Sequence, residues 1–186
     1  MLVGGCHCGT VTYEFPPAPT IDLDGADVPD LLKNNIVPPS KQRFPERGTR
    51  PKLNKWRASH CHCGACRRTV GALMVDWVNV PSADLIIHRK GPTGKYRASD
   101  HASREFCQTC GTSLFFLDDE EPEIIDVTVA SIKTPNVFDF IEFNGHIWVE
   151  DVASLVLDEA GKGGGLTGVL VDGLPRSVQS RGTKPF

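Results

Sequence analysis

Seven cysteines in tight clusters constrain this 186-residue chain more than any other feature. They stand as C-x-C, C-x-x-C or an overlap of the two, in the segments 5–9, 61–66 and 106–111. An odd number of clustered cysteines does not suit a disulfide framework, whose cysteines pair and spread along the chain. Pairs one or two residues apart are typical of zinc sites, where each pair occupies one edge of a tetrahedron. The sequence therefore predicts a zinc protein from a reducing compartment.

Two of the clusters are predicted to share one structural zinc ion. Cys107 and Cys110, followed by Gly111, have the spacing of a zinc knuckle, and Cys6 and Cys8 offer the second edge of the tetrahedron. The flanking glycines let the chain turn sharply, so that backbone N–H groups can point at sulfur. Structural zinc of this type contributes about 10 kcal/mol or more to folding, so we expect its loss to unfold the protein.

The third cluster is predicted to hold a second zinc ion with one coordination position open. Its ligands are Cys61, Cys63 and Cys66. Catalytic zinc sites have three protein ligands plus water or substrate, whereas structural sites have four. The alternative is that a distant Asp or His closes a second structural site. The histidines considered for that role are His88, His101 and His146.

The charge of this open site indicates what it would bind. Three thiolates around a dication leave a net charge of −1, so the ion activates water less strongly than one held by neutral imidazoles. A sulfur-rich zinc site instead suits a thiolate ligand, whose pKa it lowers. Thiol or thioether substrates are therefore expected. Arg67 and Arg68 follow the cluster. They offset its negative charge, hold a substrate carboxylate through bidentate hydrogen bonds, or are merely exposed.

Three further polar residues lie near the open cluster in the sequence. His62 stands between two ligands and is expected to point away from the metal. His60 and Asp76 are candidates for a proton shuttle, although surface or packing roles are the more frequent ones for such residues. The motifs of zinc deaminases, serine hydrolases, zinc proteases and P-loop proteins are absent from the sequence.

The pattern of short apolar segments predicts a mainly β fold with antiparallel sheets and few short helices. We expect one domain over 1–186, with a proline-rich, basic insertion at about 16–57 and an irregular tail at about 175–186. One long strand is expected at 70–80. The other expected strands are 10–15, 84–88, 94–97, 103–106, 112–117, 124–130 and 138–143, with another at 146–150.

Net charge and hydropathy limit the classes of partner that the protein is expected to bind. The net charge of −3 does not favour nucleic acid, and neither a secretory signal nor a membrane span is evident, so we expect a soluble cytoplasmic protein. Seven basic residues and one acid lie within 41–57, whereas six acids and no base lie within 118–126. Both runs are interpreted as solvated loops, or the basic run guides an anionic ligand towards the cysteines that follow it. A homodimer is one assembly that the sequence permits.

The motifs G-G-C-H-C-G-T-V-T-Y, C-H-C-G-A-C-R-R-T and R-E-F-C-Q-T-C-G-T-S-L are together similar to those of the glutathione-dependent formaldehyde-activating enzyme family, whose zinc domain is also of the centromere protein V type. The resemblance implies several coiled β-sheets, a structural zinc on Cys6, Cys8, Cys107 and Cys110, and a catalytic zinc on the other three cysteines. It also implies reversible joining of glutathione to formaldehyde. The stretch between Cys8 and Cys61 is longer than is usual in that family.

The leading functional prediction is a zinc-dependent carbon–sulfur lyase that acts on glutathione or a related thiol adduct. One alternative is a zinc lyase, hydrolase or isomerase that acts on a specialised metabolite without glutathione. The other is a non-catalytic zinc module that binds protein or nucleic acid through the basic run at 41–57.

Overall fold

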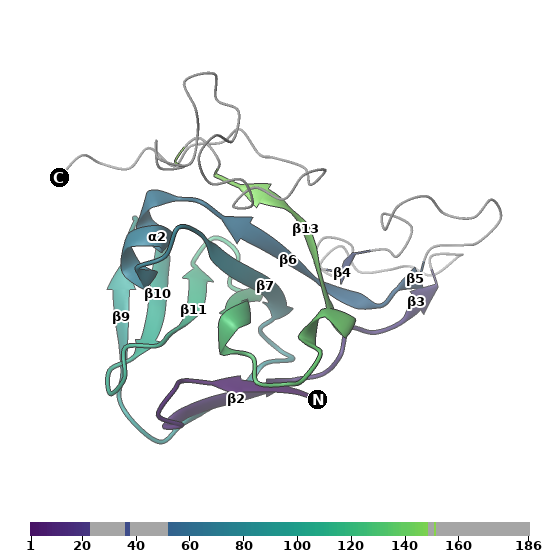
Figure 1. Cartoon of the computed structure of the whole chain (residues 1–186), viewed down its shortest axis with the longest axis horizontal. Helices are drawn as coiled ribbons and strands as arrows, with labels where there is room; N and C mark the ends of the chain where they lie inside the picture. The colour runs from purple at the N-terminus through teal and green to yellow at the C-terminus, as the bar shows by residue number, and fades with distance from the viewer. Residues whose placement is uncertain (23–35, 38–51, 149–150, 152–186) are drawn as a thin grey trace. The chain divides into compact units, whose positions relative to one another are not determined.

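The computed structural model describes residues 1–22, 36–37, 52–148 and 151 (Figure 1). Most of the predicted insertion at 16–57, including its basic run up to residue 51, and all of the predicted tail at 175–186 lie outside these residues. The same holds for the last two residues of the strand expected at 146–150. Among the described residues, no helix combines the length and the apolar character that a membrane span needs.

The chain divides into two compact units. The first contains Met1–Ala58 and Val78–Glu142, and the second contains Ser59–Trp77 and Phe143–Phe186. The Cys6, Cys8, Cys107 and Cys110 cluster belongs to the first unit. The Cys61, Cys63 and Cys66 cluster belongs to the second. Each unit therefore carries its own group of thiols.

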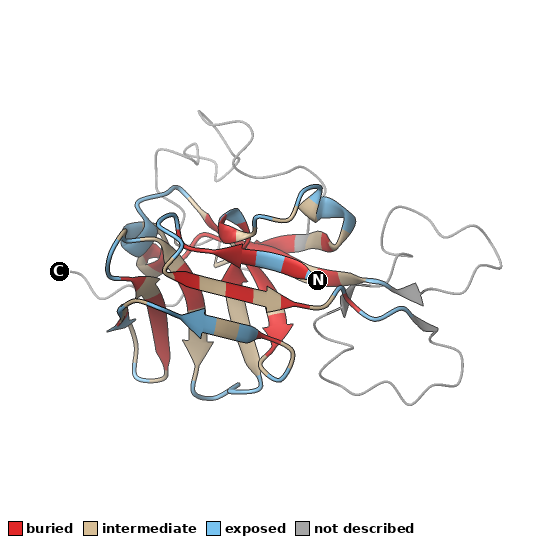
Figure 2. Cartoon of the chain, turned by 90° about the horizontal axis from the view of Figure 1, so that it is seen from below, coloured by how far each residue is buried: buried red, intermediate tan, exposed pale blue. Residues whose placement is uncertain are grey.

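A three-stranded antiparallel sheet contains the N-terminus of the first unit. Its strands, in hydrogen-bonded order, are β1 (Leu2–Gly5), β2 (Val11–Phe15) and β8 (Ile86–Arg89). Leu2 pairs with Phe15, and Val11 pairs with Arg89. Every second side chain of β2 is buried, as its alternating sequence requires. In Figure 2, buried and partly buried residues alternate along β2, whereas β8 has no buried residue.

A larger sheet has the strand order β13-β6-β7-β12-β11-β10-β9, with β4 (Ile36–Val37) paired to β6. The bounds are β13 (Ile141–Ile147), β6 (Lys55–Cys61), β7 (Val75–Pro81), β12 (Ile124–Thr128), β11 (Ser113–Asp118), β10 (Ala102–Cys107) and β9 (Thr93–Arg97). Figure 1 shows β9, β10 and β11 side by side. Strands β3 (Ile21–Asp22) and β5 (Lys52–Leu53) form a separate pair.

Within the described residues, three short helical segments lie between the strands. They are α2 (Gly64–Val70) and the 3₁₀ turns η2 (Val129–Ser131) and η3 (Val137–Asp139). Among the described residues, α2 is the only α-helix. The mainly β architecture predicted from the sequence, with antiparallel sheets and few short helices, is therefore confirmed.

Aromatic side chains join the two sheets of the first unit. The Tyr13 ring from β2 meets the Phe115 ring from β11 edge to face, with centroids 5.5 Å apart. The Tyr13 hydroxyl makes a 2.6 Å hydrogen bond with Ser131 Oγ, which provides the polar partner that a buried phenol needs. This packing places β1–β2 over β10–β11, the two hairpins that carry the four-cysteine cluster.

The prediction of one long strand at 70–80 is wrong for the first half of that segment. Helix α2 ends at Val70, Gly71 follows at φ 72°, and β7 begins only at Val75. Gly71 adopts the left-handed conformation and its N–H bonds to Arg67 O at 2.8 Å, which ends the helix. The apolar run thus contains a helix end, a turn and a strand, which hydrophobicity alone does not separate.

Candidate metal centres

The first centre is built from two similar turns. Cys6 and Cys8 lie between β1 and β2, and Cys107 and Cys110 lie between β10 and β11. In each turn the second cysteine is followed by glycine and threonine, as Cys8-Gly9-Thr10 and Cys110-Gly111-Thr112. Gly9 and Gly111 have φ values of 77° and 73°, a region that glycine enters at no steric cost.

Backbone hydrogen bonds repeat in the two turns as well. Cys6 N donates to Val11 O at 2.9 Å, and Cys107 N donates to Thr112 O at 3.0 Å. Gly9 N donates to Cys6 O, and Gly111 N donates to Cys107 O. Both hairpins therefore close in the same way and direct their sulfur atoms to one side.

The sulfur atoms of the two turns fit one tetrahedral ion. All four Sγ atoms lie within 4.8 Å of one another. Cys6 Sγ is 3.5 Å from Cys8 Sγ, and Cys8 Sγ is 3.6 Å from Cys107 Sγ. Zinc–sulfur bonds of about 2.3 Å in a tetrahedron place the sulfurs about 3.8 Å apart. The cluster could therefore hold a metal ion with little rearrangement.

Hydroxyl and amide groups favour the thiolate form of Cys110 and Cys6. At Cys8 the Thr10 hydroxyl and N–H act to lower the pKa, but burial and the Cys6 and Cys110 thiols outweigh them and the pKa is raised. Thr112 Oγ1, 3.2 Å from the sulfur, and contacts with Cys8 lower the pKa of Cys110 to about 5. Burial acts to raise the pKa of Cys6, but the Val11 N–H, the Thr10 hydroxyl and two neighbouring cysteines outweigh it, and the pKa is lowered to about 7. Metal ligands must be deprotonated, so these groups prepare the turns for a cation.

The second centre contains Cys61, Cys63 and Cys66, all buried, with their sulfurs within 4.8 Å of one another. Cys61 ends β6, Cys63 is the N-cap of α2, and Cys66 lies in its first turn. Cys63 Sγ accepts the Cys66 N–H at 3.3 Å. Three cysteines from one strand end and one helix turn thus surround the same point.

Without a cation, these three thiols resist deprotonation. Hydrogen bonding to the Cys63 and Cys66 thiols, together with burial and their charges, raises the pKa of Cys61. Three adjacent thiolates in a buried position repel one another, and a dication is the partner that removes this repulsion. The donor set, all sulfur and all from the protein, fits a soft or borderline ion such as zinc.

Within the part of the chain that the structure describes, no histidine or carboxylate joins these three sulfurs. His146, considered above as a fourth ligand, lies with Nδ1 2.8 Å from His62 Nε2. His88 and His101 belong to the first unit, where they face Glu14 and Asp118. The open fourth position therefore stays a prediction.

Sequence reasoning missed most of a histidine cluster in the second unit. The His60 ring stacks on Phe143 with centroids 4.1 Å apart and on His146 at 4.6 Å, and its Nδ1 is 2.7 Å from Asp76 Oδ1. The sequence offers His60 and Asp76 as separate candidates for a proton shuttle, but it predicts neither their contact nor the stacking of His146 on His60. The spacing of His60 and His62 was an available signal, because side chains two apart on an extended strand share a face.

The two arginines of α2 differ in their surroundings. Arg67 is partly buried, and its Nε has no hydrogen-bond partner and no solvent contact. Arg68 is exposed. A buried guanidinium nitrogen without a partner is unusual in proteins, so Arg67 is the better placed of the two to receive an anionic group.

The fold and the two thiol clusters define a β-rich protein that could hold two metal ions. The model of the glutathione-dependent formaldehyde-activating enzyme family matches residues 49–151, more than half of the sequence. The chain belongs to this family. The match includes the three-cysteine cluster, Cys107 and Cys110, whereas Cys6 and Cys8 precede it.

A solved structure is also similar to this chain. It is the crystal structure of a Rhodobacter sphaeroides protein, a structural genomics target, with 23% sequence identity and a TM-score of 0.44. The similarity covers 76% of this chain and 98% of that one. No curated protein matches the sequence.

Proposed function

We propose that this chain is a zinc-dependent carbon–sulfur lyase that acts on glutathione or a related thiol adduct. Family membership supports a glutathione-related or other thiol-linked activity. In the joining direction, the thiol sulfur bonds to the carbonyl carbon of formaldehyde and the carbonyl oxygen takes up a proton. Cleavage reverses both events and restores thiol and aldehyde. The observation that carries the proposal is the group of three buried sulfurs, Cys61, Cys63 and Cys66, which lie within 4.8 Å of one another.

The cysteines would hold the ion and set its character. When bound, zinc would supply a positive charge that keeps a substrate sulfur deprotonated at neutral pH. The three cysteine thiolates reduce that charge, so water is activated less strongly than at a site made of imidazoles. The Cys66 N–H donates to Cys63 Sγ and so stabilises the thiolate form of this ligand. Such a donor set favours exchange of one sulfur ligand over hydrolysis.

Arg67 is proposed to bind a carboxylate of the substrate. Glutathione carries two carboxylates, and its adducts keep both. A guanidinium offers parallel N–H donors that match a carboxylate, and the partnerless Arg67 Nε is one such donor. Arg67 also follows Cys66 directly and offsets the negative charge of the thiolate cluster.

The pair of His60 and Asp76 is proposed to hold the proton that moves between sulfur and oxygen. Asp76 Oδ1 lies 2.7 Å from His60 Nδ1 and so orients the imidazole, while stacking on Phe143 fixes the plane of the ring. A fixed ring with one nitrogen bound to a carboxylate presents its other nitrogen in a defined direction, as general acid–base catalysis needs.

The test is Cys63→Ser, because serine is itself a good N-cap and leaves α2 capped. We expect the variant to keep its circular dichroism spectrum, lose about one zinc per chain and lose turnover of S-hydroxymethylglutathione. Full activity in the variant would refute the proposal. If the unsubstituted protein turned over a different thiol adduct but not S-hydroxymethylglutathione, the proposed metal centre would stand and the proposed substrate would change.

Cys107→Ser serves as the contrasting variant. Cys107 joins turns about 100 residues apart, whereas the second cluster closes only a few residues, so the first ion restricts the unfolded chain far more. We expect Cys107→Ser to unfold or aggregate. A folded, soluble Cys107→Ser protein with native thermal stability would contradict a structural role for this centre.

A further inference from the structure

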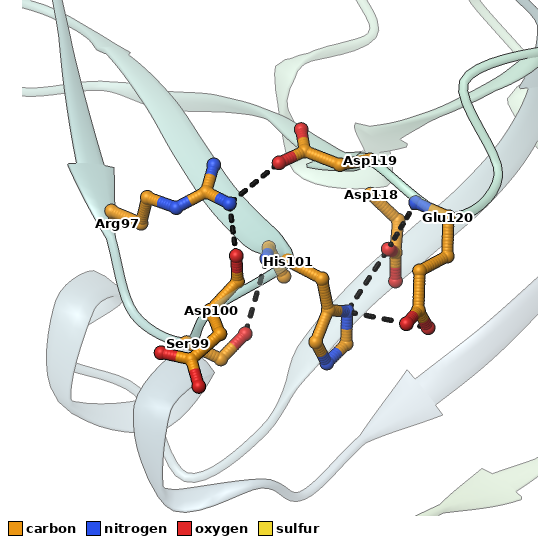
Figure 3. Close-up of polar contacts among 8 residues, drawn as sticks. Arg97, Ser99, Asp100, His101, Asp118, Asp119 and Glu120 are labelled. Carbon is orange, nitrogen blue, oxygen red and sulfur yellow. Dashed lines mark hydrogen bonds and ion pairs between the residues drawn. The ribbon is translucent and has the colours of Figure 1, made fainter.

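A third group of metal-ligating side chains lies at the open end of the β10–β11 hairpin (Figure 3). His101 directly precedes β10, Asp118 ends β11 and Glu120 follows it in the next turn. Ala102 pairs with Asp118 in the sheet, and Asp119 N donates to His101 O at 2.8 Å. The strand register therefore brings the imidazole and the two carboxylates together from either side of the hairpin.

The distances among these groups match those around an ion. His101 Nδ1 lies 3.0 Å from Asp118 Oδ1 and 3.8 Å from Glu120 Oε2, and the three ligand atoms lie within 4.8 Å of one another. Ligands at 2.0–2.2 Å from an ion are roughly 3.0 to 3.5 Å apart. In Figure 3 the same ring nitrogen faces both carboxylates. Small side-chain movements would therefore bring all three atoms to ligand distance.

The charge around the group favours a cation. Asp118 and Glu120 belong to a run of six acidic residues without a base at 118–126. Arg97, the one cation drawn in Figure 3, has its Nη2 2.6 Å from Asp119 Oδ2 and donates to Asp100 O, so its charge is directed at these neighbours. The side chains of His101, Asp118 and Glu120 are 38%, 18% and 75% exposed, so an ion and its water ligands can reach them.

We propose that His101, Asp118 and Glu120 bind a divalent first-row transition-metal ion, separate from both cysteine clusters. One imidazole and two carboxylates suit Zn²⁺, Co²⁺ or Mn²⁺, whereas Mg²⁺ and Ca²⁺ prefer sites made of oxygen alone. The ion would bind Nδ1 of the neutral imidazole, whose single proton then resides on Nε2. Two carboxylates balance the charge of the dication, and water completes its coordination.

The position of this site in the β10–β11 hairpin indicates that a bound ion would stabilise the hairpin. Cys107 and Cys110 occupy the turn at one end of β10–β11, and the His101 group occupies the other end, a strand length of about 20 Å away. An ion at each end would fasten both strands. Because it binds only the closed hairpin, the third ion would raise the melting temperature in proportion to the logarithm of its concentration.

The experiment uses the full chain with its cysteine sites saturated by zinc. Calorimetric titration with Zn²⁺ is expected to show one further equivalent. Mn²⁺, which prefers oxygen and nitrogen to sulfur, is the second probe. Substoichiometric Mn²⁺ is expected to broaden the His101 ring signals in NMR spectra, without broadening those of the exposed His7.

Four variants separate a built site from a general attraction of cations. His101→Gln and Glu120→Gln are each expected to lower the affinity for the further metal equivalent by about tenfold or more, as the loss of one ligand would. Glu120 is so exposed that its replacement does not endanger folding. The controls Asp119→Asn and Glu121→Gln remove the same charge next to the triad and are expected to leave the affinity within about twofold.

Any of three results would overturn this site. The first is a titration that ends once the cysteine clusters are saturated, with no broadening at His101. The second is an equal loss of affinity in Asp119→Asn and Glu120→Gln, since that would show attraction to the acidic run without specific ligands. The third is unchanged binding of the extra equivalent by His101→Gln, which would exclude the imidazole as a ligand.

Discussion

The hydroxyl of Thr10 lies 3.4 Å from the sulfur of Cys107, although 97 residues separate them in the sequence. The same hydroxyl is 3.7 Å from Cys6 Sγ and 3.2 Å from Cys8 Sγ. One side chain therefore contacts sulfur atoms of both turns of the four-cysteine cluster. Its counterpart Thr112 contacts Cys110 in the second turn.

Replacing Thr10 by valine, which has nearly the same shape, is expected to lower the free energy of unfolding by about 1 to 2 kcal/mol, because hydrogen bonds to thiolates are lost. Zinc release to a chelator should also accelerate. Thr12→Val is the matched control, since the Thr12 hydroxyl makes no hydrogen bond among the described residues. Equal zinc release rates in the two variants would contradict this role of Thr10.

The ion pair of Arg89 and Glu105 links the two sheets that carry the cysteine turns. Arg89 Nε and Nη2 donate to the Glu105 carboxylate at 2.7 and 3.1 Å. The Glu105 side chain is 1% exposed and that of Arg89 is 41% exposed. The carboxylate also raises the pKa of Arg89 by hydrogen bonding. Loss of the arginine thus leaves a buried carboxylate whose remaining ion-pair partner is the exposed Lys95, with Nζ 3.9 Å away. Loss of the carboxylate instead leaves an arginine charge that water reaches.

Arg89→Met is therefore expected to destabilise the protein by about 2 to 4 kcal/mol, and Glu105→Gln by about 1 kcal/mol. The double variant should be less destabilised than the sum of the two, because the buried charge is then absent. Arg97→Met, which removes an exposed ion pair, is the control and should change stability by about 0.5 kcal/mol or less. Denaturant melts measure the free energy of unfolding of all four variants. Equal destabilisation by Arg89→Met and Arg97→Met would contradict the larger cost expected for leaving the Glu105 charge buried.

Arg67→Ala is expected to raise KM for a carboxylate-bearing thiol adduct by about tenfold to a hundredfold, as expected for loss of a charge-assisted contact. Arg68→Ala, one residue further along α2 and exposed, is the control and should change KM by about twofold or less. Steady-state kinetics with glutathione adducts and with an adduct of an uncharged thiol measure the contribution. If Arg67→Ala raised KM equally for both adducts, a role of Arg67 in binding the substrate carboxylate would be excluded.

Asp76→Asn tests the proposed proton path without removing His60. Asparagine keeps the size of the side chain but weakens the orientation of the imidazole, so kcat is expected to fall by about tenfold or more while KM changes little. Asp84→Asn, in the turn before β8, is the matched control. If Asp76→Asn kept a normal kcat but had a lowered melting temperature, the His60–Asp76 pair would contribute to packing and not to proton transfer.

The strands and the cysteine groups could largely be predicted because both depend on local sequence. Alternation in β2 and the flanking glycines of the Cys107 turn are readable within a few residues. β1 and β6 were missed as strands: β1 is short and contains two glycines, and the His60–Cys61 end of β6 belongs to the thiol and histidine cluster. Helix α2 was missed because seven residues give too few turns for a periodic pattern.

The residues around the cysteines depend on the tertiary structure. Thr10 and Cys107, Arg89 and Glu105, and His101 and Asp118 lie in different strands or turns, and nothing in the spacing of these residue types indicates that they meet. Only the strand order and register bring them together. The acidic run at 118–126 illustrates this, since its composition indicates a solvated loop until the hairpin places His101 beside it.

By itself, the sequence determined which cysteines could bind metal, because sulfur ligands one or two positions apart need only a local turn to face the same point. The tertiary structure decided which groups surround those sulfurs, and so their pKa values and charge balance. Those properties arise from contacts across sheets, where residues far apart in the chain are brought within a few ångströms by hydrogen-bond register and side-chain packing.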